Sequence, residues 1–250
     1  MLCYLLPVQA APEIQITKPP DDGNPIRRDY AATSDVLLVV FSGLKQNPRA
    51  IPGFSFKKIT DELPAKKLFL RDLDRAWFLK GLRGVTGNVE ETLAFLRAEA
   101  KTAGARRVVL TGYSLGGFAA LLYGALLGAD EVQAISPQTF ITFWRRLRCG
   151  DHRWRRYIWR LHFSNTRRFH DLKPVLQQAT GTKFHVHFAR DSRCDPFHAE
   201  HVRGLPGVIL HEYAEGGHRL VTALHDNGEL RRILADAVAG ESLRAAPQIG

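Results

Sequence analysis

Short apolar runs of strand length recur along the chain, separated by stretches with helical periodicity. A continuous apolar run is typical of a strand in a parallel sheet whose two faces are both covered by helices. The alternation predicts an α/β protein with a mostly parallel sheet flanked by helices, and an active site at the carboxyl ends of the strands. The predicted strands span residues 35–41, 67–71, 107–111, 131–135, 183–189 and 208–213.

Local signals define the ends of two helices. Asn88 followed by Glu91 forms a capping box, which predicts a helix through about Ala103 that closes near Gly104. Residues 229–239 predict a closing helix. These helices fit the same α/β alternation.

The two ends of the chain carry weaker signals. Residues 14–16 and 19–25 are expected to form a short edge strand and a turn cluster. Residues 1–10 have a short apolar core but no basic leader, so we interpret them as the start of the fold rather than as a signal peptide. The residues after Gly240 are expected to form a loose tail.

Bulk composition narrows the class of protein. The chain has 250 residues, 45% of them hydrophobic, and fits one large globular domain over 1–250. No apolar stretch approaches the roughly 20 residues that span a bilayer. The cysteines are too few and too scattered for a disulfide framework, so a reducing, cytoplasmic location is expected. They are Cys3, Cys149 and Cys194.

The sequence Gly-Tyr-Ser-Leu-Gly-Gly at residues 112–117 lies between the strand at 107–111 and an apolar, helical stretch. A serine hydroxyl is a poor nucleophile, so an enzyme exposes it on a sharp strand-to-helix turn where a base can reach it. Ser114 is therefore the candidate nucleophile. The simpler alternative is an ordinary glycine-rich turn in which Ser114 caps the following helix.

The general base must come from a later loop at the same edge of the sheet. His218 follows the last predicted strand and two glycines, which allow the backbone to turn the imidazole towards Ser114. Without the serine motif, a surface-loop histidine would be the better interpretation. The other histidines show no recognised metal spacing. His185 and His187 alternate within a predicted strand, and His198 and His201 fall on a predicted helix.

A carboxylate must orient the histidine and stabilise its protonated form. The loop after the strand at 183–189 offers Asp191 and Asp195. We favour Asp195, because Asp191 lies very close to the strand end. Asp195 followed by Pro196 also fits an N-cap and first residue of a helix, so a purely structural role is the alternative.

An oxyanion hole needs two backbone N–H groups that point at the developing negative charge. Leu115, directly after the serine, is expected to supply one. The other is expected from the loop after the strand at 35–41, where Leu44 is the first choice and Gly43 the second.

These features resemble those of serine hydrolases of the α/β-hydrolase superfamily. The resemblance covers about residues 35–239 by element order, and its specific motifs are residues 112–117, Asp195 and the Gly-Gly-His at 216–218. It implies an eight-stranded, mostly parallel sheet and a two-step mechanism through an acyl-enzyme. Residues 41–44 lack the His-Gly of many lipases and esterases.

The net charge of +10 is concentrated in residues 140–170, here called the arginine-rich segment. It lies within residues 138–180, which are expected to form a cap or lid insertion between two strands. Its one acidic residue is Asp151. Its nine arginines are Arg145, Arg146, Arg148, Arg153, Arg155, Arg156, Arg160, Arg167 and Arg168.

An amphipathic helix is expected within residues 151–163. One face carries Trp154, Tyr157, Ile158 and Leu161, and another carries Arg153, Arg156 and Arg160. The helix either packs on the body with a solvated basic face, or attracts an anionic substrate, an acidic partner or a phospholipid surface. Nucleic acid is disfavoured, because no binding module is present. Trp77 fits a substrate pocket or the core equally well.

The sequence thus supports two functional hypotheses. The first is a carboxylic-ester hydrolase, without cofactor or metal, in which Ser114 attacks, His218 moves the proton and Asp195 orients His218. Its substrate is a small, ester-like molecule, neutral or anionic, and thioester or amide chemistry stays open. The second is a catalytically silent protein of the same fold that docks an acidic partner or a membrane surface through the arginine-rich segment.

Overall fold

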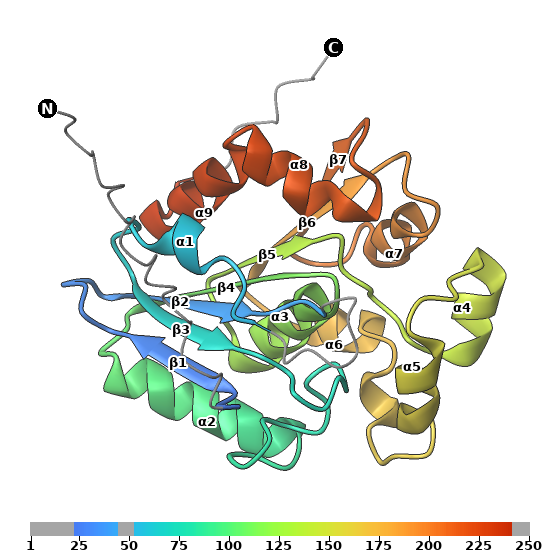
Figure 1. Cartoon of the computed structure of the whole chain (residues 1–250), viewed down its shortest axis with the longest axis horizontal. Coiled ribbons are helices and arrows are strands. Elements are labelled where there is room, and N and C mark those ends of the chain that lie inside the picture. The colour runs from blue at the N-terminus through green and yellow to red at the C-terminus, as the bar shows by residue number, and fades with distance from the viewer. Residues whose placement is uncertain (1–22, 45–52, 242–250) are drawn as a thin grey trace, which may run out of the picture.

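A seven-stranded sheet lies at the centre of the structure, a computed structural model that describes residues 23–44 and 53–241 (Figure 1). The strands are β1 (Ile26–Asp29), β2 (Val36–Phe41), β3 (Lys66–Leu70), β4 (Arg107–Tyr113), β5 (Glu131–Ile135), β6 (Lys183–Ala189) and β7 (Val208–Tyr213). Their order in the sheet is β1-β3-β2-β4-β5-β6-β7. Strands β2 to β7 run parallel, and β1 pairs antiparallel with β3. The predicted architecture is confirmed.

All six predicted strands form, and their ends lie within about two residues of the predicted ones. Strand β1 was not predicted, because Ile26 is the one buried residue in its four and leaves no apolar pattern. Within the described residues the sheet has seven strands, not the eight implied by the resemblance. The expectations for residues 1–10, 14–16 and the end of the tail lie outside the described residues.

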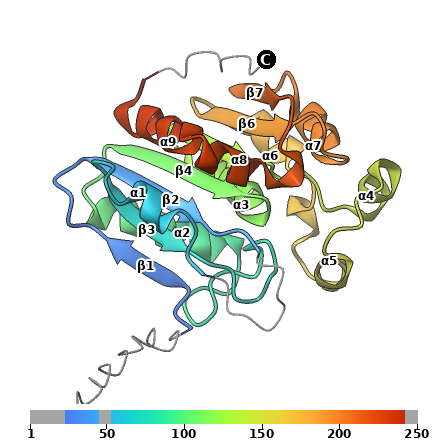
Figure 2. The same ribbon diagram turned by 45° about the horizontal axis from the view of Figure 1, so that its top comes forward.

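Helices cover both faces of the sheet (Figures 1 and 2). They are α1 (Lys57–Thr60), α2 (Val89–Thr102), α3 (Leu115–Leu127), α6 (Lys173–Gln178), α7 (Asp195–Val202), α8 (Leu220–Asp226) and α9 (Glu229–Ala239). Alternate side chains of β2 point to opposite faces: Leu37 and Val39 pack on the side of α2, α3, α6 and α7, while Leu38 and Val40 pack on the side of α8 and α9. Both faces of the strand are therefore buried.

The predicted capping box opens α2. The Asn88 side chain accepts a hydrogen bond of 2.8 Å from the Glu91 N–H, and the Glu91 carboxylate accepts one from the Asn88 side-chain amide at 2.7 Å. Gly104, with φ 61°, follows the end of the helix, so both predicted ends are confirmed. Helix α9 has the predicted bounds.

Between β5 and β6 the chain leaves the sheet, and α4 (Phe143–Cys149) and α5 (Arg155–Leu161) lie beside it in both views (Figures 1 and 2). A 3₁₀ helix, η1 (Arg167–Phe169), follows. Ile158 and Leu161 of α5 are buried against the core, as the periodicity predicted. The prediction that Arg153 lies on the basic face of this helix is wrong, because α5 begins two residues later.

Two of the three cysteines lie in the described part of the chain. Cys149 and Cys194 are buried free thiols. Of the helices formed by residues 23–44 and 53–241, none combines the length and the apolar character needed to cross a membrane.

Candidate active site

Ser114 occupies the sharp turn between β4 and α3. Its backbone has φ 55° and ψ −116°, a conformation that residues with a side chain rarely adopt. Such strain persists where the surrounding structure enforces it, and it is common at functional sites. The Ser114 side chain makes no capping hydrogen bond to α3, so the simple helix-cap interpretation is not supported.

Two glycines allow the turn to close. A Cβ atom on Gly112 would lie 2.2 Å from the carbonyl oxygen of Gly116, and one on Gly116 would lie 2.1 Å from the carbonyl oxygen of Phe41. Both clashes are with backbone, which cannot swing aside. The small residues that flank the serine are thus required by close packing of β2, β4 and α3.

We expect Gly116→Ala to lower the free energy of unfolding by about 2–3 kcal/mol, because the added methyl group is forced against the backbone of β2. In an open helix the same change would be stabilising by about 1 kcal/mol. Urea unfolding measures the difference. Gly87→Ala is the matched control, because a Cβ at Gly87 meets Glu91 at 3.5 Å, an ordinary contact. Equal stability of the two variants would contradict the packing argument.

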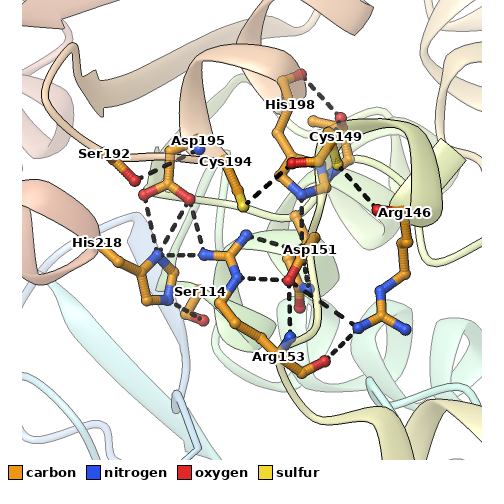
Figure 3. A network of polar contacts seen from close by, with 12 residues as sticks. Ser114, Arg146, Cys149, Asp151, Arg153, Ser192, Cys194, Asp195, His198 and His218 are labelled. Carbon is orange, nitrogen blue, oxygen red and sulfur yellow. Dashed lines mark hydrogen bonds and ion pairs between the residues drawn. The ribbon is translucent and has the colours of Figure 1, made fainter.

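His218, in the 3₁₀ helix η2 (Gly217–Arg219), lies between Ser114 and Asp195 (Figure 3). Its Nε2 atom is 3.0 Å from Ser114 Oγ, and its Nδ1 atom is 2.9 Å from Asp195 Oδ2 and 3.1 Å from Oδ1. The three side chains come from three separate segments at the carboxyl edge of the sheet. The geometry permits a proton to pass from the hydroxyl to the imidazole while the carboxylate holds the opposite ring nitrogen.

The two candidate carboxylates do different things. Asp195 is buried as the first residue of α7, with Cys194 rather than Asp195 at the N-cap position. Asp191 instead accepts the N–H groups of Gly216 at 3.3 Å and Gly217 at 2.8 Å. Asp191 therefore fixes the backbone of the loop that carries His218 and does not contact the imidazole.

The loop after β2 packs against the serine turn. A Cβ on Gly43 would lie 2.5 Å from the Tyr113 ring, so the two loops are in direct contact. The Gly43 N–H, the second choice for the oxyanion hole, already donates a hydrogen bond to Ser55 Oγ at 3.3 Å. This favours Leu44 over Gly43. The assignment of Leu44 and Leu115 to an oxyanion hole stays a prediction.

Arg153 was not predicted at the site, yet its guanidinium reaches it (Figure 3). Nη1 is 2.8 Å from Asp195 Oδ1 and 2.7 Å from His218 Nδ1. The other side of the guanidinium binds both oxygens of Asp151, each at 2.9 Å. The arginine-rich segment thus places one cation between two buried carboxylates.

Arg153 and Asp195 compete for the same ring nitrogen. An arginine can only donate, so a hydrogen bond from Arg153 to Nδ1 requires that Nδ1 carries no proton. Nε2 would then carry it and donate to Ser114. A hydrogen bond from Nδ1 to Asp195 requires the opposite tautomer, in which Nε2 can accept the serine proton.

Asp151 connects this cluster to the core. It contacts His198 Nε2 at 3.2 Å and accepts from Gln138 Nε2 at 3.1 Å, and Gln138 in turn accepts from Trp77 Nε1 at 2.9 Å. Trp77 is fully buried, which settles it as a core residue. The one sequence feature that pointed to this network is Asp151, the single acidic residue among nine arginines.

The charges of the two carboxylates follow from their partners. Burial acts to raise the pKa of Asp195, but the hydrogen bond with His218 and the charge of Arg153 hold that pKa below its usual value. Burial also opposes ionisation of Asp151, yet contacts with His198 and Arg153 bring its pKa far below the usual range. Both groups are therefore ionised at neutral pH.

The remaining strand histidines lie apart from this cluster. His185 contacts His211, at 2.8 Å, and His187 contacts Tyr213 and Gln133. Burial lowers the pKa of His185 to about 4 and that of His187 well below its usual value, so both are neutral and structural at pH 7. In the described part of the chain, no group of three or more His, Cys, Asp or Glu side chains is placed to hold a metal ion.

Comparisons with known proteins bear on the fold. No family model and no curated protein matches the sequence. Among solved structures, the chain is similar to the capsule O-acetyltransferase of Neisseria meningitidis serogroup A, with a TM-score of 0.64 and 14% identity over 85% of this chain and 91% of that one. It is also similar to MGS-M2, an α/β-hydrolase enzyme from a deep-sea metagenome library (TM-score 0.56, 12% identity, 88% and 94% covered). A third is FphF, a fluorophosphonate-binding serine hydrolase of Staphylococcus aureus (TM-score 0.56, 11% identity, 81% and 83% covered).

At these identities the similarity concerns the fold. The chain has the α/β-hydrolase fold, with a mostly parallel sheet flanked by helices. Its structural neighbours include an α/β-hydrolase enzyme, a proline iminopeptidase, a serine hydrolase and a lipolytic enzyme. A fold hosts many chemistries, so the reaction has to be argued from the site itself.

Proposed function

We propose that the protein is a serine hydrolase of carboxylic esters that works through an acyl-enzyme. The observation that carries the proposal is the series Ser114, His218 and Asp195, joined by contacts of 3.0 and 2.9 Å at a strained strand-to-helix turn. The fold-level similarity to an α/β-hydrolase enzyme and to a fluorophosphonate-binding serine hydrolase supports it.

In the first step, Ser114 Oγ attacks the carbonyl carbon of the ester. His218 Nε2 takes the hydroxyl proton, and the carbonyl π electrons move to oxygen to give a tetrahedral oxyanion. The Leu44 and Leu115 N–H groups are the proposed donors to this oxyanion. The carbonyl re-forms, the alkoxide leaves with the proton from Nε2, and the acyl group stays on Ser114.

In the second step, water replaces the alcohol. His218 Nε2 removes a proton from water as the water oxygen attacks the acyl carbon. The second tetrahedral intermediate then collapses to the free acid, and Nε2 returns the proton to Ser114 Oγ as the bond between the acyl carbon and Oγ breaks. Throughout, Asp195 holds Nδ1–H and stabilises the protonated ring. The arginine-rich segment, which supplies Arg153 to the site, favours an ester with an anionic group.

Arg153 acts in this scheme as a positioning residue. Its hydrogen bond to Asp195 Oδ1 fixes the carboxylate opposite His218 Nδ1. In the productive tautomer the guanidinium binds the two carboxylates, and His218 donates to Asp195.

Arg153→Gln is therefore expected to reduce kcat for ester hydrolysis about tenfold, because the Asp195 carboxylate loses a charged hydrogen-bond donor that fixes it beside His218. Arg153→Lys keeps a cation and should lose less. Steady-state kinetics measures both, and circular dichroism melting shows that each variant is folded. A folded Arg153→Gln protein with the kcat of the wild type would contradict the positioning role.

A fluorophosphonate probe tests the proposed function. The serine oxygen should displace fluoride from phosphorus, with a matching mass increase on the intact protein and on the peptide that contains Ser114. A screen of acyl esters graded in chain length and charge then defines the substrate. A protein that takes up no probe and hydrolyses none of the esters would instead be the catalytically silent binding protein.

The similarity to an O-acetyltransferase favours a second candidate, acyl transfer to a hydroxyl acceptor in place of water. The same acyl-enzyme would serve both reactions. Adding sugars to the ester assay distinguishes them, because a transferase forms acylated sugar at the expense of free acid. Release of free acid alone, at an unchanged rate, would exclude this candidate for the sugars used.

A further inference from the structure

Exposed hydrophobic side chains are concentrated on the arginine-rich segment. Among the described residues, eight large hydrophobic side chains are exposed, and five of them lie in this segment. Trp144 is 76% exposed and Phe163 71% exposed, so these side chains contribute little to the packing of the domain. The five are Phe143, Trp144, Leu147, Trp159 and Phe163.

These side chains belong to one face. Phe143 and Leu147 of α4 and Trp159 of α5 line the same cavity, of about 590 Å³. Trp144 stacks edge-on with Phe143, at 5.1 Å between ring centres, and Phe163 does so with Trp159, at 5.3 Å. We call this surface of α4, α5 and Phe163 the α4–α5 face. It lies at the side of the molecule beyond the sheet (Figures 1 and 2).

The same face is strongly basic. Arg155 and Arg156 line the cavity together with the apolar side chains. Other exposed arginines have acidic partners: Arg145 pairs with Asp171 at 2.9 Å, and Arg168 pairs with Glu90. On α4 and α5, four exposed arginines form no ion pair with an acidic side chain of the described residues, and their charge is available to an anionic partner. They are Arg148, Arg155, Arg156 and Arg160.

We infer that the α4–α5 face docks on a bilayer rich in anionic phospholipid. Tryptophan and phenylalanine insert favourably at the level of the head groups, and arginines contact lipid phosphates. A purely polyanionic partner would satisfy the arginines but leave five large hydrophobic side chains in water. A neutral bilayer would cover those side chains but leave the charge unused. The inference does not depend on the proposed hydrolase activity.

The test is co-sedimentation of the whole chain with vesicles. Vesicles of phosphatidylglycerol and phosphatidylcholine should bind the protein, and vesicles of phosphatidylcholine alone should not. Arg155→Gln with Arg156→Gln should weaken binding roughly 30-fold, since each basic residue near an anionic surface contributes about fivefold. Trp144→Ala with Trp159→Ala should weaken it about tenfold or more.

Matched variants keep the test specific. Arg106→Gln with Arg190→Gln removes the same charge from exposed positions elsewhere, and Val85→Ala with Ile209→Ala removes apolar surface elsewhere. Both control pairs should bind as the wild type does. Circular dichroism melting shows that each variant is folded.

Three results would overturn the inference. One is an absence of binding to phosphatidylglycerol vesicles. Another is binding that the control pairs weaken as much as the α4–α5 pairs do. The third is binding to polyglutamate that exceeds binding to vesicles and is insensitive to the tryptophan changes, which would point to an acidic protein partner.

Discussion

Ser114→Ala is expected to reduce kcat for ester hydrolysis by roughly 10⁴–10⁶-fold and to abolish fluorophosphonate labelling. The hydroxyl is the one group lost, and the strained backbone at φ 55° is as accessible to alanine as to serine. The loss should therefore fall on the reaction and leave the fold intact. Steady-state kinetics with an ester that the wild type hydrolyses measures the loss of kcat. The mass of the intact protein after exposure to the fluorophosphonate measures the loss of labelling.

Ser34→Ala is the matched control for this variant. Ser34 accepts a hydrogen bond from the Val36 N–H at the opposite end of the sheet from Ser114. Its replacement should leave kcat and labelling unchanged. Turnover near the wild-type value in Ser114→Ala would rule out Ser114 as the nucleophile.

Asp195→Asn is expected to reduce kcat by about 10⁴-fold, the size seen when the orienting aspartate of a Ser-His-Asp site becomes an amide. The amide no longer stabilises the protonated imidazole. Its NH₂ group can also donate to Nδ1, which stabilises the tautomer that cannot accept the serine proton. The same change removes a charged partner from Arg153, which lies 2.8 Å from Asp195 Oδ1.

Asp191→Asn is the comparison for this prediction. The new amide would retain one carbonyl oxygen for the N–H groups of Gly216 and Gly217, so the loop should keep most of its support. We expect a loss of about tenfold or less, through imperfect placement of His218. A larger loss in Asp191→Asn than in Asp195→Asn would reverse the assignment of the acid.

The parts of the fold that follow from local patterns were predictable. Apolar runs of strand length predicted β2 to β7, and in β2 the run is continuous because a strand buried on both faces must be apolar at nearly every position. The serine turn was predictable because its glycines meet backbone atoms that leave no room for a side chain. Strand β1 carried no signal, since an edge strand with one buried residue has no period to detect.

The candidate site was predictable to the extent that its residues follow strand ends. Ser114, Asp195 and His218 each lie just beyond a predicted strand, and parallel strands bring their carboxyl ends to one edge. Arg153 was assigned to a solvated helix face by its spacing. Its inward direction depends on where α5 begins and on the buried carboxylates of Asp151 and Asp195, which belong to tertiary structure.

The ion cluster formed by Asp151, Arg153 and Asp195 also constrains how the chain can evolve. Loss of Arg153 alone would leave the buried carboxylates of Asp151 and Asp195 without their shared cation. Loss of either carboxylate would leave Arg153 with one acidic partner instead of two. A substitution at only one of these three positions is therefore expected to lower the free energy of unfolding and to be removed by selection. In homologous sequences that retain the serine turn, the three positions should be inherited or replaced together, and covariation between 151, 153 and 195 should be visible.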